Sequence, residues 1–422
     1  MPRLFEVEFK PPFLLVKSSR ITSTFDRLGK TRLAGALGWA SLGLLPFIAG
    51  AGLTLLLLSL VAIVSRPEVQ EAQRQAGPQS LLLIPGLNPY LPILYGWLAL
   101  VIALVVHEGM HGVLARRLGY TVKSSGIILF LVLPIGAFVE TDDKEIKTGR
   151  VRDVSRILAG GPASNIAMAL ICLAVLATIS LGLQPAPIMV LEDVFEGSPA
   201  MEAGLKPGDR LLSVNGKPAV SLSVLSSSIS EAGYGGSVEL EVAREGVGVL
   251  RFRVGVAELG LGRPMIGVSI GNAEVQEWAN QYLGSYKSSV TRNPLIFLLP
   301  PSLYPAHPFS QLSICQDETA AEPRCWPVAS IFQHPLLGSA YPPIANLLFW
   351  VWFVNFNVGI FNALPIYPLD GGQILRRVLS ASLGARIGEA GVRLAVTIIS
   401  LALVGIVLSL FTVPYLAPLI AS

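Results

Sequence analysis

Charged residues are scarce in this chain. Asp, Glu, Lys and Arg make up only 14% of its 422 residues, whereas 52% are hydrophobic, and the mean hydropathy is +0.60. An ordinary soluble domain has about 25% charged residues. The composition therefore predicts a polytopic membrane protein. The net charge of +3 is small, and the basic residues lie in blocks beside apolar runs, which argues against a nucleic-acid partner.

Cysteine is scarce too, with three residues in the whole chain. This number is too small for a disulfide framework, although Cys315 and Cys325 flank a polar stretch that could close into one small loop. Cys172 lies in an apolar run and is expected to be a packing residue. A removable signal peptide is not expected, because the first thirty residues mix basic side chains with short apolar stretches.

Apolar segments long enough to cross a bilayer occur five times, since a spanning helix needs about 20 residues. They cover residues 34–64, 91–118, 157–181, 345–369 and 392–416. We expect a multi-pass protein of the cell membrane with about five transmembrane helices.

The distribution of basic residues predicts the orientation of these spans. Basic residues precede the first span and place the N-terminus in the cytoplasm, among them Lys10, Lys17, Arg20, Arg27, Lys30 and Arg32. Alternation of the spans puts the basic loop 116–156 on the same side, and also the loop before the last span, with Arg376, Arg377 and Arg386. The insert between residues 184 and 343 is then extracytoplasmic.

The first part of this insert contains strand-like runs and a dense set of turn signals. Residues 196–217 read EGSPAMEAGLKPGDRLLSVNGK, and Ser237–Val242 and 250–256 alternate as strands do. The stretch resembles a circularly permuted PDZ domain, a fold that binds chain ends by adding a strand to a sheet edge. We therefore expect an inserted α/β PDZ-like domain with a possible peptide ligand. Residues 285–343 are rich in proline and show no periodicity.

The sequence pattern suggests five regions. They are an N-terminal cytoplasmic segment with an extra span (1–90), a first half of a membrane core (91–183), the PDZ-like domain (187–257), a proline-rich segment (258–343) and a second half of the core (344–422).

Residues 126–139 are apolar but too short to span a membrane as a helix, and they contain Pro134 and Gly136. They could form a re-entrant hairpin, provided that other helices or a water-filled cleft shield the backbone. A buried apolar loop is the alternative.

The strongest chemical signal is the HExxH sequence at residues 107–111. His107 and His111 lie one helical turn apart and can bind one zinc ion, while Glu108 can act as general base towards a metal-bound water. The motif follows sixteen uncharged residues, and ionisable groups at membrane depth usually mark a functional site.

A zinc site of this kind needs a third protein ligand and an open position. The two remaining histidines, His307 and His334, lie in the extracytoplasmic segment and are expected to be solvated loop residues. Asp370 is the better candidate. Arg376 and Arg377 follow it by six and seven residues, and Arg116 and Arg117 follow His111 by five and six, which predicts a similar depth in the membrane. Pro365 and Pro368 would break the helix before Asp370, whose alternative role is a helix cap.

The segment from Asn362 to Gly371 matches NxxPxxxxDG, and together with HExxH it resembles the site-2 protease family of intramembrane metalloproteases. The resemblance implies that His107, His111 and Asp370 bind one zinc ion and that Glu108 is the catalytic base. It gives Asn362, with Pro365 in the same motif, a supporting or substrate-binding role. Gly161 to Asn165 resembles the family's GPxxN segment, where Asn165 could support the site or simply bond a neighbouring helix.

The resemblance implies hydrolysis of peptide bonds in or near transmembrane helices of membrane-anchored substrates, as in regulated intramembrane proteolysis. Hairpin 126–139 would hold the substrate as an extended strand. One alternative is a non-catalytic membrane adaptor that acts through its PDZ-like domain. Another is a zinc protease of the prenyl-peptide type, but the downstream Glu389 lies in a polar connection rather than an apolar helix.

Overall fold

The structure is a computed structural model. It describes residues 6–421 except 19, 131–132, 186–188, 220–221, 245–246, 261, 272, 293–312, 317–323 and 328–331. The chain divides into two compact units, of which the first comprises Met1–Val175 with Leu347–Ser422 and the second Leu176–Asn346. Each unit is described separately.

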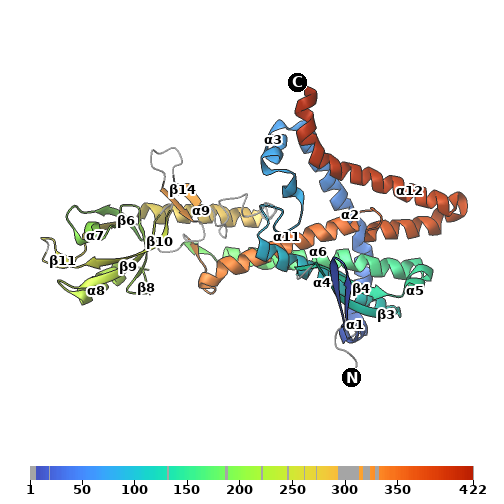
Figure 1. The fold of residues 1–422 in the computed structure, drawn as a ribbon, viewed down its shortest axis with the longest axis horizontal. Coiled ribbons are helices and arrows are strands. Elements are labelled where there is room, and N and C mark those ends of the chain that lie inside the picture. The colour runs from blue at the N-terminus through green and yellow to red at the C-terminus, as the bar shows by residue number, and fades with distance from the viewer. Residues whose placement is uncertain are drawn as a thin grey trace. The chain divides into compact units, whose positions relative to one another are not determined.

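Five helices in the described residues are long and apolar enough to cross a membrane, which confirms the predicted number of candidate spans. They are α2 (Arg32–Ser65), α4 (Ile93–Arg117), α6 (Val151–Leu181), α11 (Tyr341–Ala363) and α12 (Asp370–Ala421) (Figure 1).

The last two spans differ from their predicted bounds. Helix α11 ends at Ala363 rather than residue 369, because Pro365 cannot continue a helix, and the next helix begins at Asp370. Residues 370–387, predicted as a polar loop, are helical. Their helix joins the final apolar helix through a bend at Gly388, whose φ of 67° suits glycine (Figure 1).

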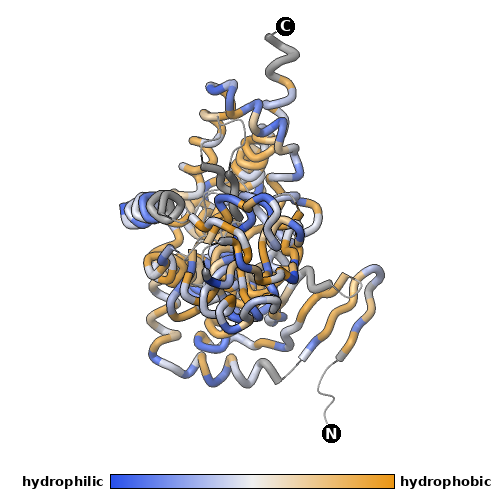
Figure 2. The backbone as a smooth tube through the Cα atoms, turned by 90° about the vertical axis from the view of Figure 1, so that its left-hand side faces the viewer, coloured by the Kyte–Doolittle hydropathy of each residue, from blue (hydrophilic) through white to orange (hydrophobic). Residues whose placement is uncertain are grey.

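A four-stranded antiparallel sheet belongs to the first unit. Its order is β1 (Glu6–Lys10), β2 (Phe13–Ser18), β3 (Val122–Phe130) and β4 (Leu133–Thr141). Strands β3 and β4 form the hairpin expected at 126–139, whereas the N-terminal hairpin was not predicted. Gly126 allows close pairing with β2, since a Cβ there would lie 2.3 Å from the Val16 carbonyl oxygen. Figure 2 shows hydrophobic residues along the strands beside the N-terminus.

Short elements precede or connect the spans of this unit. They are α1 (Arg20–Gly29), before the first span, and α3 (Pro67–Ala76), η1 (Pro78–Leu81) and α5 (Asp143–Thr148) between spans. Helices α4 and α6 approach each other closely, because a Cβ on Gly160 would lie 2.5 Å from Leu114 Cδ1. Phe25 of α1 packs in the same way on Gly112 of α4. The Gly160 contact therefore brings α6 close to α4, and the Gly112 contact brings α1 close to α4.

The second unit contains a sheet of order β10-β9-β7-β6-β13, with β8 paired to β7. Its strands are β6 (Met189–Val194), β7 (Arg210–Val214), β8 (Lys217–Pro218), β9 (Ser237–Arg244), β10 (Gly248–Gly255) and β13 (Val268–Gly271). Helices α7 (Pro199–Glu202) and α8 (Leu222–Ala232) accompany it. Its core is aliphatic, and β13 extends the sheet past residue 257, where the sequence pattern placed its end.

The described part of the second unit also contains helix α9 (Ala273–Arg292), η3 (Gly338–Ala340) and three small strand pairs. These pairs are β5 (Gln184–Pro185) with β16 (Phe332–Gln333), β11 (Ala257–Glu258) with β12 (Pro264–Met265), and β14 (Ser313–Gln316) with β15 (Arg324–Pro327). The last pairing sets Cys315 opposite Cys325 in the backbone register.

The prediction that His334 is a solvated loop residue is wrong. His334 is buried, its ring stacks on Tyr341 with the centroids 5.7 Å apart, and its Nδ1 accepts hydrogen bonds from the amides of Leu336 and Leu337. Histidine pays little for burial when its polar nitrogen is bonded in this way. His307 lies outside the described residues.

Candidate active site

Helix α4 presents His107 and His111 on one face. The residues are four positions apart, so their side chains project from neighbouring turns, and the two ring centroids lie 4.8 Å apart. His107 is buried and His111 is partly buried. The side chains are thus shielded from solvent although both rings are polar.

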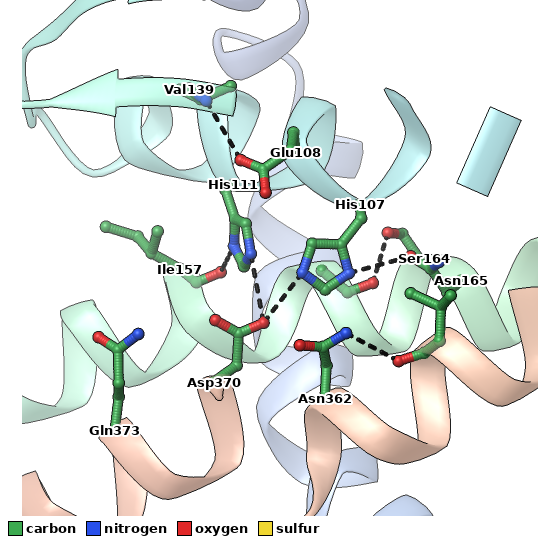
Figure 3. A network of polar contacts seen from close by, with 12 residues as sticks. His107, Glu108, His111, Val139, Ile157, Ser164, Asn165, Asn362, Asp370 and Gln373 are labelled. Atoms are coloured by element: carbon green, nitrogen blue, oxygen red, sulfur yellow. Dashed lines mark hydrogen bonds and ion pairs between the residues drawn. The ribbon is translucent and has the colours of Figure 1, made fainter. Parts of the chain in front are cut away.

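Hydrogen bonds on the far side of each ring determine which nitrogen carries the proton. His111 Nδ1 lies 2.8 Å from the Ile157 carbonyl oxygen, which can only accept, so Nδ1 carries the hydrogen. His107 Nδ1 lies 3.2 Å from Asn165 Oδ1 (Figure 3). The amide nitrogen of Asn165 donates to the Ala103 carbonyl, so its oxygen is the acceptor for the His107 ring. Both Nε2 atoms therefore present lone pairs.

Asp370 points at these two lone pairs from the first residue of α12. Its Oδ2 lies 3.1 Å from His107 Nε2 and 3.4 Å from His111 Nε2 (Figure 3). The carboxyl group is buried, and this oxygen has no hydrogen-bond partner among the described residues. Asp370 thus begins a helix, and the structure brings it to both histidines.

The loop that carries Asp370 is held tightly against α12. The amide of Tyr367 donates to Ser400 Oγ at 2.9 Å, and Ser400 is buried in the second half of α12. A Cβ on Gly371 would lie 2.1 Å from the Ala363 carbonyl oxygen, and one on Gly372 would lie 2.3 Å from the Ile366 carbonyl carbon. Glycines at both positions therefore allow the loop to fold back onto the helix start.

With both imidazoles in these neutral tautomers, His107 Nε2, His111 Nε2 and Asp370 Oδ2 meet with no hydrogen between them. Such an arrangement is unfavourable unless a metal ion or an added proton lies among the three atoms. Two imidazoles and one carboxylate form a common zinc-binding set in catalytic sites. Zinc ligands at about 2.0–2.1 Å in a tetrahedron lie roughly 3.3 Å from one another. The distances of 3.1 and 3.4 Å agree with that spacing, so these residues fit a zinc ion.

Gly161 of α6 keeps the space beside the imidazoles open. A Cβ at this position would lie 2.6 Å from His111 Nε2 and 2.7 Å from His107 Nε2. Any side chain would therefore enter the space on which the lone pairs converge. The GPxxN pattern includes this glycine, but the sequence alone does not reveal what it faces.

Glu108 points to the other side of α4, towards the sheet. Its Oε2 accepts a hydrogen bond of 3.1 Å from the amide of Val139 in β4 (Figure 3). One carboxylate oxygen of Glu108 still lies within 4.8 Å of a ring nitrogen of each histidine. We call His107 Nε2, His111 Nε2 and Asp370 Oδ2 the donor set. The Glu108 carboxylate is close enough for a water molecule to lie between it and the donor set.

Asn362 and Pro365 lie near the site but outside the donor set. The side-chain amide of Asn362 donates to the Val358 carbonyl at 3.0 Å, one turn back in α11 (Figure 3). Pro365 lies in the connection between α11 and α12. No hydrogen bond joins Asn362 to His107 or His111 among the described residues, so Asn362 neighbours the site without holding either imidazole.

The family model named Peptidase family M50 matches residues 95–407. The chain belongs to peptidase family M50. The matched part runs from α4 into α12 and includes every residue of the site, while α2 and the β1–β2 hairpin lie before it. The helices that carry the donor set are therefore the part that this M50 chain shares with its family.

Three relatives extend the comparison. The chain is 25% identical to "Uncharacterized protein MJ0971" of Methanocaldococcus jannaschii over 86% of its length and 76% of the relative's. It is 27% identical to "Putative zinc metalloprotease LL2128" of Lactococcus lactis over 54% of its length, which spans about half (49%) of that relative. It is 25% identical to "Putative zinc metalloprotease CPE1693" of Clostridium perfringens, over 67% and 86% respectively.

Proposed function

We propose that this M50 member is an intramembrane zinc metalloprotease, which hydrolyses peptide bonds in or near transmembrane helices of membrane-anchored proteins. The observation that carries the proposal is the meeting of His107 Nε2, His111 Nε2 and Asp370 Oδ2 inside a bundle of apolar helices. The names of two relatives, which include zinc metalloprotease, support the choice of metal. One ion would be held by the three residues.

The roles of the residues follow from their positions. A zinc ion in this site would polarise the scissile carbonyl and acidify the attacking water. Glu108 takes the proton from that water and passes it to the leaving nitrogen. Asn165 and the Ile157 carbonyl keep both imidazoles in the tautomer that leaves Nε2 free. Asn362 and Pro365 support the loop and the approach of the substrate.

Strand β4 is a suitable place for the substrate. It is the last strand of its sheet, and no other strand pairs with its outer edge among the described residues. A peptide bond in a helix is already hydrogen-bonded, and the substrate must therefore unwind before it is cut. Addition to β4 would replace the lost hydrogen bonds beside Glu108, to which the strand is already linked through Val139.

The sheet of the second unit supports a PDZ-like assignment for that part of the chain. Strand β13 is at the end of the sheet and, in the described part of the chain, pairs only with β6, which leaves an edge for an extended peptide ligand. We place this domain outside the cytoplasm and the N-terminus inside it, in the plasma membrane. The support for this orientation is the cluster of basic residues before α2 and after α4. We also retain the five-part division at residues 90, 183 and 343, and we move the end of the PDZ-like part from residue 257 to Gly271, where β13 ends.

The decisive experiment compares Glu108→Gln with Glu389→Gln in the purified full chain. The substrate is a model transmembrane helix in detergent or lipid, and zinc is measured in the same samples. Glu108→Gln should lower the cleavage rate at least about 10²-fold and keep stoichiometric zinc, because the glutamate is a base rather than a ligand. Glu389 is exposed and bonded to Ser380, so its substitution should change neither quantity.

Each competing function predicts a different outcome of that experiment. A non-catalytic adaptor would show no cleavage by the wild type and no stoichiometric zinc. A protease whose third ligand is a downstream glutamate would lose zinc in Glu389→Gln. Cleavage at the normal rate by Glu108→Gln would overturn the assignment of the base.

A further inference from the structure

A cluster of arginines lies at one end of α2, α4 and α6. Arg117 ends α4, and a Cβ on Gly35 of α2 would lie 3.1 Å from its Nη2 and 3.3 Å from its Nε. Arg156 of α6 reaches the same residue, because its Nη2 donates to the Gly35 carbonyl oxygen at 3.4 Å. Two guanidinium groups from different helices therefore meet at one glycine.

The negative charge near this cluster is smaller than the positive charge. Asp153 is buried and lies 3.0 Å from Arg150, 3.7 Å from Arg152 and 3.8 Å from Arg156, so one carboxylate serves three guanidinium groups. None of the ion pairs found in the described part of the chain involves Arg117. The cluster as a whole carries an uncompensated positive charge.

One hydrogen-bond donor of Arg156 is unpaired among the described residues. Its side chain is only 9% exposed, and its Nε has no hydrogen-bond partner among the described residues. Its guanidinium lies 4.4 Å from the centre of the Trp39 ring, and that of Arg152 lies 5.5 Å from the same ring. A buried, unpaired donor is costly, and an anion would satisfy it.

The surroundings indicate where the anion comes from. Trp39 is 51% exposed and lies two turns into a candidate span, where tryptophan commonly marks the boundary between lipid headgroups and acyl chains. Beyond it on the same face of α2 follow Gly43, Phe47 and Gly50, all exposed and apolar. Neither glycine would bring a Cβ within 4 Å of another group, so this face leaves room for an acyl chain.

We propose that Arg117, Arg152, Arg156 and Trp39 form a binding site for the phosphate of an anionic phospholipid. The lipid would join α2 to α4 and α6, of which α4 carries His107 and α6 carries Asn165. Since α2 lies outside the part matched by the family model, the site would tie an additional helix to the shared core. The inference does not depend on peptidase activity.

The test is native mass spectrometry of the full chain in detergent, titrated with dioleoyl phosphatidylglycerol or dioleoyl phosphatidylcholine. The wild type should bind phosphatidylglycerol at least about 10-fold more tightly, because each arginine near a membrane surface contributes a factor of about five. Arg117→Gln should weaken that binding about fivefold, and Arg117→Gln with Arg152→Gln about 25-fold. Both side chains are exposed, so both variants should fold.

Arg386→Gln is the matched control, since it removes one exposed charge from α12 and should leave lipid binding within about twofold of the wild type. Equal binding of the two lipids would overturn the proposal. So would an equal loss in Arg386→Gln and Arg117→Gln, which would indicate a general effect of charge. Full competition by inorganic phosphate at the lipid concentration would show a free-phosphate site and overturn the assignment to a lipid.

Discussion

Gly161→Ala is expected to weaken zinc binding at least about 10²-fold without unfolding the chain. A Cβ at this position would lie 2.6–2.7 Å from both Nε2 atoms and from His107 Cε1, whereas an ordinary contact begins at 3.4 Å. The rings or α6 must therefore move by about 0.8 Å, and zinc ligands tolerate only about 0.2 Å. A misplacement of about 1 Å costs roughly 10²-fold in rate. We expect at least this loss in both zinc affinity and cleavage.

Gly109→Ala is the matched control for this prediction. Gly109 lies within HExxH on the same helix as the histidines, and a Cβ there would meet no other group within 4 Å. Alanine in place of glycine in a helix normally stabilises by about 0.5–1 kcal/mol. Gly109→Ala should therefore keep zinc and activity and unfold at the same or a higher temperature.

The assay measures zinc per chain by elemental analysis, cleavage of a model transmembrane helix and thermal unfolding of all three proteins. Stoichiometric zinc in Gly161→Ala together with a normal rate would refute the reasoning. It would show that the gap beside the imidazoles is not the metal position. A loss of folding in Gly161→Ala would show up as a lowered unfolding temperature after metal removal, and comparison of the metal-free proteins therefore separates the two effects.

Three further variants test the rest of the site. Asp370→Asn should retain folding but lower zinc occupancy, measured after dialysis against a weak chelator, and unchanged occupancy would exclude Asp370 as a ligand. Asn165→Ala removes the hydrogen-bond acceptor of His107 Nδ1 and should weaken zinc binding about 10–100-fold in a competition titration. An unchanged zinc affinity would show that the Asn165 amide serves only to bond α4. Ser400→Ala leaves the amide of Tyr367 without an acceptor and should lower the stability of the fold by about 1–3 kcal/mol in chemical unfolding, whereas a change below 0.5 kcal/mol would show that the loop is held by other contacts.

The spans and the chemical motifs could be recognised from the sequence because their signals are local. A run of about 20 apolar residues predicts a span by itself, and two histidines four residues apart predict a shared helix face. The contact between Asp370 and the histidines is not local. The similar sequence distances to the arginine pairs predicted a similar depth for Asp370 and the histidines. Whether their side chains face one another depends on how closely α6 packs on α4, which Gly160 and Gly161 allow.

The N-terminal hairpin shows what sequence patterns miss. Residues 6–18 contain basic side chains that indicated a cytoplasmic segment, yet the segment forms β1 and β2 and pairs with β3 more than a hundred residues away. Register between such distant strands leaves no local signal. A similar reason applies to residues 370–387, whose charges suggested a loop although their residues favour a helix.

His334 illustrates the same limit for a single side chain. A histidine between prolines and polar residues is expected in solvent, and the proline-rich context gave no reason to bury it. Stacking on Tyr341 and two backbone donors make burial favourable, and neither partner can be identified from composition.

The division of the site between two distant helices has a consequence for synthesis in the cell. His107 and His111 enter the membrane early, but Asp370 follows about 260 residues later, which takes roughly 10–50 s at common translation rates. During that interval the nascent chain has a general base and two imidazoles but no third ligand. The proposed peptidase would thus be inert while it is made, and its activity would begin only after its last helices are inserted.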